Sequence, residues 1–157
     1  MKKKSAFFIA QIIGLVIGFA GTVRVLLASE ETFPGAAVLP AGFPSTTGLT
    51  VIWGFLFLLW GIGSFFVYKV KLSPRRERNI FLNSLILIIG IFVWNFLLFG
   101  QMNLSGALAV IFAALLLAVV VWFMYLVTHR YGGYLFIPMM IWLCFALYLS
   151  IALVTKN

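Results

Sequence analysis

The stretch SGALAVIFAALLLAVVVWFMYLV, residues 105–127, carries no charged side chain and decides the class of fold. A helix needs about 20 apolar residues to cross the hydrocarbon core of a bilayer, and this stretch is long enough. Comparable apolar runs occupy residues 5–28, 46–68, 79–99 and 133–154. Because backbone polar groups must be satisfied internally within a bilayer, each run is predicted to be a helix. We therefore expect an all-α membrane protein, a bundle of five transmembrane helices forming a single domain over residues 1–157.

Charge predicts the orientation of this bundle. If the N-terminus is cytoplasmic, only Arg24 and Lys156 of the 11 Lys and Arg residues lie outside, together with Glu30 and Glu31. The other cations all fall on the cytoplasmic side: Lys2, Lys3, Lys4, Lys69, Lys71, Arg75, Arg76, Arg78 and Arg130. The positive-inside rule favours this topology, so the net charge of +8 indicates orientation and contact with anionic lipid, not a nucleic-acid site. We expect an aromatic belt at the cytoplasmic interface, formed by Tyr68, Tyr125, Tyr131 and Tyr134.

The start of the chain has a second interpretation. Lysines followed by an apolar run are also typical of a cleaved signal peptide. The run is too long for that, it contains Arg24, and Leu26-Leu27-Ala28 is a poor cleavage site. We expect a retained first helix.

One connection is long. Residues 29–45, SEETFPGAAVLPAGFPS, form the predicted outside loop between the first and second helices, with Phe33 and Phe43 as its aromatic residues. Pro34, Pro40 and Pro44 are expected to prevent a regular helix through it. A loop of this length in a compact bundle is often a lid over a binding site, and a plain linker is the alternative.

The ionisable residues exclude several chemistries. The chain has no Asp, its three acidic residues are Glu30, Glu31 and Glu77, all expected outside the spans, and its one His, His129, falls in a turn. We therefore predict no catalytic residue, no paired-carboxylate site and no metal site. Arg24 lies about one turn from the outer end of its span. Its side chain either reaches the interface by snorkelling, towards the glutamates, or clamps an anionic ligand group.

Aromatic residues on three helices are expected at one depth. Trp53, Phe57 and Trp60 share a face of the second helix because their spacing is i, i+4, i+7. With the predicted topology, Trp53 and Phe57 lie in the outer half of the bundle, as do Trp94 and Asn95 of the third helix. Trp142 and Phe145 of the fifth helix lie near the middle, so aromatic residues of three helices approach one level under the outside loop. A cavity lined by aromatic rings and one amide suits a flat, largely apolar ligand. The alternative is that these rings fill a solid core or face lipid.

Small residues indicate where helices touch. Ala10, Gly14 and Gly18 recur at intervals of four in the first span, the pattern that lets helix backbones approach closely. This pattern predicts packing and carries no chemistry.

Three blocks resemble the translocator protein or tryptophan-rich sensory protein (TspO/MBR) family over essentially the whole chain. LPAGFPSTTGLTVIWGFLFLLWGIGSFFVYK resembles the family's proline-rich loop and second helix, WNFLLFG the end of its third helix, and LFIPMMIWLCFALYLSIALVTKN its fifth. The positions that match the motifs in these blocks are Trp53, Leu56, Phe57, Gly61, Trp94, Phe99, Gly100, Pro138, Trp142, Phe145, Ala146 and Leu149.

The resemblance implies a five-helix bundle, a homodimer, and a pocket open towards the first loop. The homodimer is compatible with the Leu/Ile face of the third span. Family members bind porphyrins, haem or, in some cases, sterols. No cofactor is required, and a bacterial cytoplasmic membrane is the expected location. The pocket residues that the resemblance adds to the depth argument are Phe99 and Ala146, with Phe33 and Phe43 in the lid.

The chain departs from the family pattern at several positions. Where the family loop has tryptophan followed by tyrosine, this chain has Phe33 and Pro34, and a second loop tryptophan is replaced by Gly42. Other replacements of polar family residues are Ile91, Met139 and Ser150.

These departures from the family pattern make some functional hypotheses more favoured than others. The first is a non-enzymatic membrane protein that senses, sequesters or passes on a porphyrin-like ligand, since stacking needs only aromatic faces. A light-dependent porphyrin-degrading enzyme is less favoured, because the loop tryptophans are missing. The remaining alternative is a scaffold without a small ligand.

Overall fold

The computed structural model describes residues 2–157, with the backbone alone for residues 2–5, 34 and 36. Five of its helices are long and apolar enough to cross a membrane, which confirms that part of the predicted fold. They are α1 (Lys2–Ser29), α3 (Thr46–Lys69), α4 (Pro74–Asn95), α5 (Leu104–Thr128) and α6 (Arg130–Lys156).

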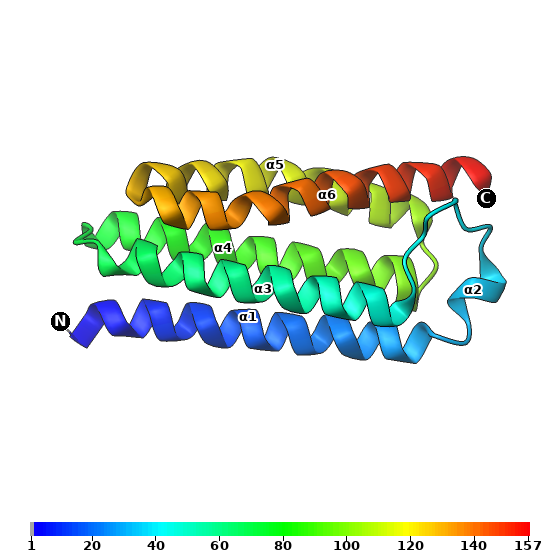
Figure 1. Cartoon of the computed structure of the whole chain (residues 1–157), viewed down its shortest axis with the longest axis horizontal. Coiled ribbons are helices and arrows are strands. Elements are labelled where there is room, and N and C mark those ends of the chain that lie inside the picture. Colours follow the sequence, from blue (N-terminus) through cyan, green and yellow to red (C-terminus); the bar gives the residue numbers. More distant parts are fainter. Residues whose placement is uncertain (1) are drawn as a thin grey trace.

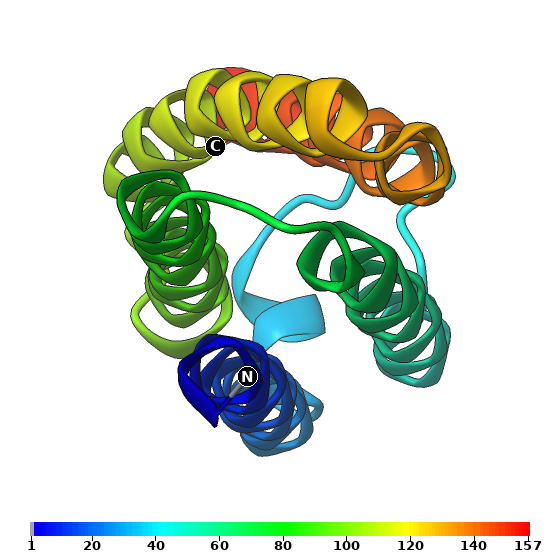
Figure 2. The ribbon, with the colours of Figure 1, turned by 90° about the vertical axis from the view of Figure 1, so that its left-hand side faces the viewer.

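The five long helices form a closed ring. Going round it, α1 packs against α3, α3 against α6, α6 against α5, α5 against α4, and α4 against α1 (Figure 2). Figure 1 shows the N-terminus and the α3–α4 and α5–α6 connections at one end of the bundle, and α2 and the C-terminus at the other. The cations of both connections therefore share one end of the molecule, as the topology argument requires.

The loop between α1 and α3, predicted above to be the outside loop, contains one helical turn, α2 (Phe33–Ala36), with Pro34 in its first turn. Proline is tolerated there because that backbone position has no helical acceptor for an N–H group. The prolines thus allow one turn, and no longer helix forms in the loop. Seen along the bundle, α2 lies across the far end of the ring (Figure 2).

The third long helix begins earlier than its apolar run. Ser73 caps α4, its Oγ accepting from the backbone N–H of Arg76 at 3.4 Å, and Pro74 follows at the first position. The start of α4 is set by the polar capping residue Ser73, and a hydropathy pattern does not detect such a residue. As a result Glu77 lies in the first turn of the helix and is only 4 % exposed. The expectation that all three glutamates lie outside the spans was wrong for Glu77.

The same helix ends in a wide turn. Residues Phe96–Gly100 form a π-helix, η1, in which the backbone N–H of Gln101 donates to the carbonyl of Phe96 at 3.0 Å. A π-turn holds one more residue than an α-turn, so it changes which side chains face the bundle interior.

Glycines mark the closest helix contacts. A Cβ built on Gly18 would lie 2.5 Å from Ile88 of α4, which confirms the predicted packing role for Gly18. A second contact of this kind joins α3 to α6, where a Cβ on Gly132 would lie 2.7 Å from Val67 and 3.1 Å from the carbonyl oxygen of Gly63. The backbones of α3 and α6 can therefore cross closely only because glycine occupies both positions.

Candidate functional site: an aromatic cluster beneath the outside loop

Three tryptophans from three helices meet in the bundle. The ring of Trp53 on α3 lies 6.1 Å from that of Trp94 on α4 and 6.0 Å from that of Trp142 on α6, measured between centroids. Trp53 and Trp94 are buried and Trp142 is half-buried. The depth argument from the sequence therefore places these side chains together correctly.

Phenylalanines continue the cluster towards the outside loop. Phe99 of η1 lies 6.3 Å from Trp94 and 4.8 Å from Phe33 of α2, and Phe33 stacks on Phe43 at 5.6 Å. Phe33 is 4 % exposed although it lies in a loop segment. Together with Phe57, whose ring is 5.9 Å from Trp53, these residues form what we term the aromatic column: Phe33, Phe43, Phe99, Trp94, Trp53, Phe57 and Trp142.

The other predicted site residues lie at its edge. Phe145 contacts Trp142 at 5.3 Å and is half-buried. Ala146 is fully buried, and its carbonyl accepts from the Ser150 hydroxyl, which also accepts the indole N–H of Trp94 at 3.0 Å. Asn95 is fully buried, but its amide nitrogen donates to the carbonyl of Ile91 in its own helix at 2.9 Å. The amide of Asn95 is therefore tied to its own helix.

Several polar atoms within this region have no hydrogen-bond partner among the described residues. The indole N–H groups of Trp53 and Trp142 and the side-chain oxygen of Asn95 are buried without a hydrogen bond. An unpaired buried polar group costs about 1–3 kcal/mol, so these atoms are natural partners for polar groups on a bound molecule.

A cavity of about 210 Å³ lies between the loop and the column. Its apolar walls include Phe33, Phe43 and Phe99, and hydroxyl groups come from Ser29 and Ser45. Pockets for drug-sized ligands usually measure about 300–1,000 Å³. The rings of the column touch one another, so this conformation is closed, and a porphyrin-sized molecule requires the loop to move.

Asn157, the residue that follows α6, holds the outside loop in place by hydrogen bonds. The side chain of Asn157 accepts the backbone N–H of Val38 at 2.8 Å and donates to the Val38 carbonyl at 3.2 Å. A third bond, from the same amide nitrogen to the Leu153 carbonyl at 3.0 Å, orients the side chain. No sequence pattern pointed to Asn157, because its partners are backbone atoms of a distant loop.

Gly42 explains one departure from the family pattern. Its φ of +81° lies in the left-handed region, which favours glycine, and the N–H of Phe43 donates to the Pro40 carbonyl at 3.2 Å in the same turn. This turn directs the adjacent Phe43 onto Phe33 and Phe99. An aromatic ring is thus supplied one position after the family's tryptophan.

Below the column, sequence reasoning missed a polar junction. The hydroxyl of Tyr125 on α5 accepts the indole N–H of Trp60 at 3.1 Å and contacts the Ser64 and Ser84 hydroxyls at 2.9 and 3.4 Å. Tyr125 is fully buried and Tyr68 is also buried, so the expectation of an interfacial belt was wrong for both. Tyr131 and Tyr134 are exposed as expected. Position along a helix does not determine which face of that helix a tyrosine occupies.

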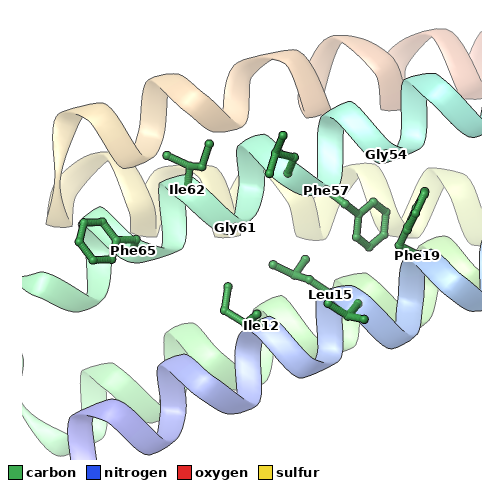
Figure 3. A pocket seen from close by; sticks show the side chains of 10 residues that line it. Ile12, Leu15, Phe19, Gly54, Phe57, Gly61, Ile62 and Phe65 are labelled. Atoms are coloured by element: carbon green, nitrogen blue, oxygen red, sulfur yellow. The ribbon is translucent and has the colours of Figure 1, made fainter.

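Two grooves on the outside of the ring border the cluster. The first, about 390 Å³, is wholly apolar and separates α1 from α3 at Gly54 and Gly61; Figure 3 shows Phe19 and Phe57 meeting across it, 6.1 Å apart. The second, about 400 Å³, lies between α1 and η1 and includes Arg24 and Phe99. Arg24 is exposed, and no hydrogen bond joins its side chain to a described residue.

No group of three or more His, Cys, Asp or Glu side chains that could hold a metal ion occurs within the described residues.

A search of curated proteins gave no match. The profile of the TspO/MBR family, however, matches residues 8–155, nearly the whole chain. An integral multi-pass membrane protein follows from that match and the five membrane-length helices. The chain belongs to the TspO/MBR family.

Proposed function

We propose that this protein binds a flat, largely apolar ligand of the porphyrin or haem type in the aromatic column, and senses, sequesters or passes it on. The observation that carries the proposal is the continuity of the column, which runs from the loop rings Phe33 and Phe43 to Trp53 and Trp142. Aromatic faces bind flat conjugated molecules by stacking, without needing a charged partner. Sterol-like molecules are apolar enough for the same walls.

The closed conformation defines how the ligand would reach the column. The cavity beneath the loop already touches Phe99, so separating the loop rings from Phe99 enlarges it towards Trp94 and Trp53. Ligand binding then selects an open form of the loop, and the affinity depends on how often that form is populated.

The rest of the assignment follows from charge and family. We place the N-terminus in the cytoplasm and the loop outside, because the cations of the α3–α4 and α5–α6 connections share one end of the bundle. A bacterial cytoplasmic membrane and a homodimer complete the proposal.

The test is a titration of the purified protein with protoporphyrin IX and haem in the dark, followed by the shift of the porphyrin absorption band. Trp142→Ala should lower the affinity about tenfold, because one stacking ring is lost. Trp142 is half-buried, so its removal leaves the fully buried core residues in place. The matched control is Trp122→Ala, which removes a half-buried tryptophan of α5 that has no aromatic contact with the column among the described residues. Absence of saturable binding would leave the scaffold function as the explanation of the packed column.

A further inference from the structure

At the opposite end of the bundle from the loop, a groove of about 720 Å³ separates α1 from α4. Its walls are of two kinds. Ala6, Phe7, Ala10 and Phe81 form an apolar part, in which the rings of Phe7 and Phe81 lie 5.5 Å apart. Arg75 and Arg78 form a cationic part.

The two arginines face the groove together. Arg78 follows Arg75 at the i+3 position in the first turns of α4, so the two share one face of that helix, and both are exposed. The backbone N–H of Arg75 also belongs to the first turn, where helical N–H groups have no helical acceptor and the helix dipole is positive. Glu77, the nearest acidic residue in sequence, is buried and does not line the groove.

We propose that this groove binds one anionic glycerophospholipid of the leaflet at this end. Its phosphodiester group pairs with Arg75 and Arg78, and an acyl chain lies over Phe7, Ala10 and Phe81. Charge complementarity points to an anion, since the described residues that line the groove include two cations and no acidic residue. The apolar wall points to a lipid, because a free phosphate would leave that wall uncovered. Basic pockets between transmembrane helices suit anionic head groups in this way.

Native mass spectrometry of the protein in detergent, titrated with phosphatidylglycerol, tests the proposal. Phosphatidylcholine with the same acyl chains is the reference lipid, and the one-to-one complex gives the affinity. Arg75→Gln with Arg78→Gln should weaken phosphatidylglycerol binding about 30-fold, since each cation contributes about fivefold. Binding of phosphatidylcholine should be unchanged. Equal affinity of the unmodified protein for both lipids would overturn the proposal.

A charge-matched control separates a defined groove from general attraction. Arg76→Gln with Arg130→Gln also removes two cations from this end, but Arg76 donates to the Thr128 hydroxyl of α5 at 3.2 Å and neither residue lines the groove. This control should lose less than threefold in affinity, roughly the screened effect of a distant cation. Equal losses in the two double variants would refute a specific site.

A third variant tests the apolar part. Ala10→Phe keeps every cation and narrows the space for the acyl chain, so phosphatidylglycerol binding should fall about tenfold with the helix content by circular dichroism unchanged. Unchanged binding would mean that charge alone holds the lipid, and would overturn the assignment of the groove.

Discussion

Replacing Asn157 by alanine removes the side chain that fastens the outside loop to α6. Two hydrogen bonds to the backbone of Val38 are lost, and both are exposed. An exposed hydrogen bond contributes a net amount near the low end of the usual range, about 0.5 kcal/mol, so the pair contributes about 1 kcal/mol. Because 1.4 kcal/mol corresponds to a factor of ten, the open form of the loop should become about five times more populated.

Two measurements follow from that fivefold change. Hydrogen exchange of the peptide covering residues 30–45, with the amide of Val38 itself excluded, should become about five times faster. The association rate of protoporphyrin IX, measured by stopped-flow, should rise by the same factor, because only the open form admits ligand. Lys156→Ala is the control, since this exposed neighbour makes no hydrogen bond to the loop among the described residues.

The two measurements refute different steps. If exchange of the loop in Asn157→Ala is unchanged, the hydrogen bonds to Val38 do not hold the loop closed. If exchange becomes faster while the association rate does not, the loop opens but is not the route to the aromatic column.

Three further predictions concern stability and assembly. Gly132→Ala should lower the free energy of unfolding by about 1–3 kcal/mol in a detergent unfolding titration, because the new Cβ overlaps α3; Gly35→Ala, where nothing lies within 4 Å, should leave it unchanged. Tyr125→Phe should cost about 1–2 kcal/mol in the same assay, since the Trp60 indole loses its acceptor, whereas Tyr148→Phe on the exposed face should cost nothing measurable. Light scattering corrected for detergent should give the mass of a dimer, and a monomer mass in several mild detergents would contradict the proposed homodimer.

Hydropathy and spacing predicted most of the fold and much of the candidate site. Apolar length located the five helices because a bilayer requires a minimum number of apolar residues per span. Helical spacing with a fixed direction for each span was enough to bring Trp53, Trp94 and Trp142 to one level. The level of a residue along the bundle depends only on its position in its helix and on the direction in which that helix runs, and the predicted topology gives both.

Rotation about each helix axis was harder to predict. Tyr125 was expected at the membrane interface, yet it faces inwards, because the Trp60 indole and two serines of neighbouring helices supply hydrogen-bond partners there. In a chain so rich in apolar residues, the lipid-facing and inward-facing sides of a helix look alike. The Asn157–Val38 contact could not be predicted from the sequence for another reason. On the loop, its donor and acceptor are the backbone N–H and carbonyl of Val38, and nearly every residue has such groups.

The π-helix at the end of α4 makes the aromatic column sensitive to chain length as well as to residue type. Removing one residue from Phe96–Gly100 would restore ordinary α-helical winding and rotate the flanking side chains by about 100° relative to each other. Phe99 would then turn away from either Phe33 or Trp94, although every aromatic residue of the column was still encoded. A relative with the same tryptophans and phenylalanines but one residue fewer in this segment would have a column broken at its middle.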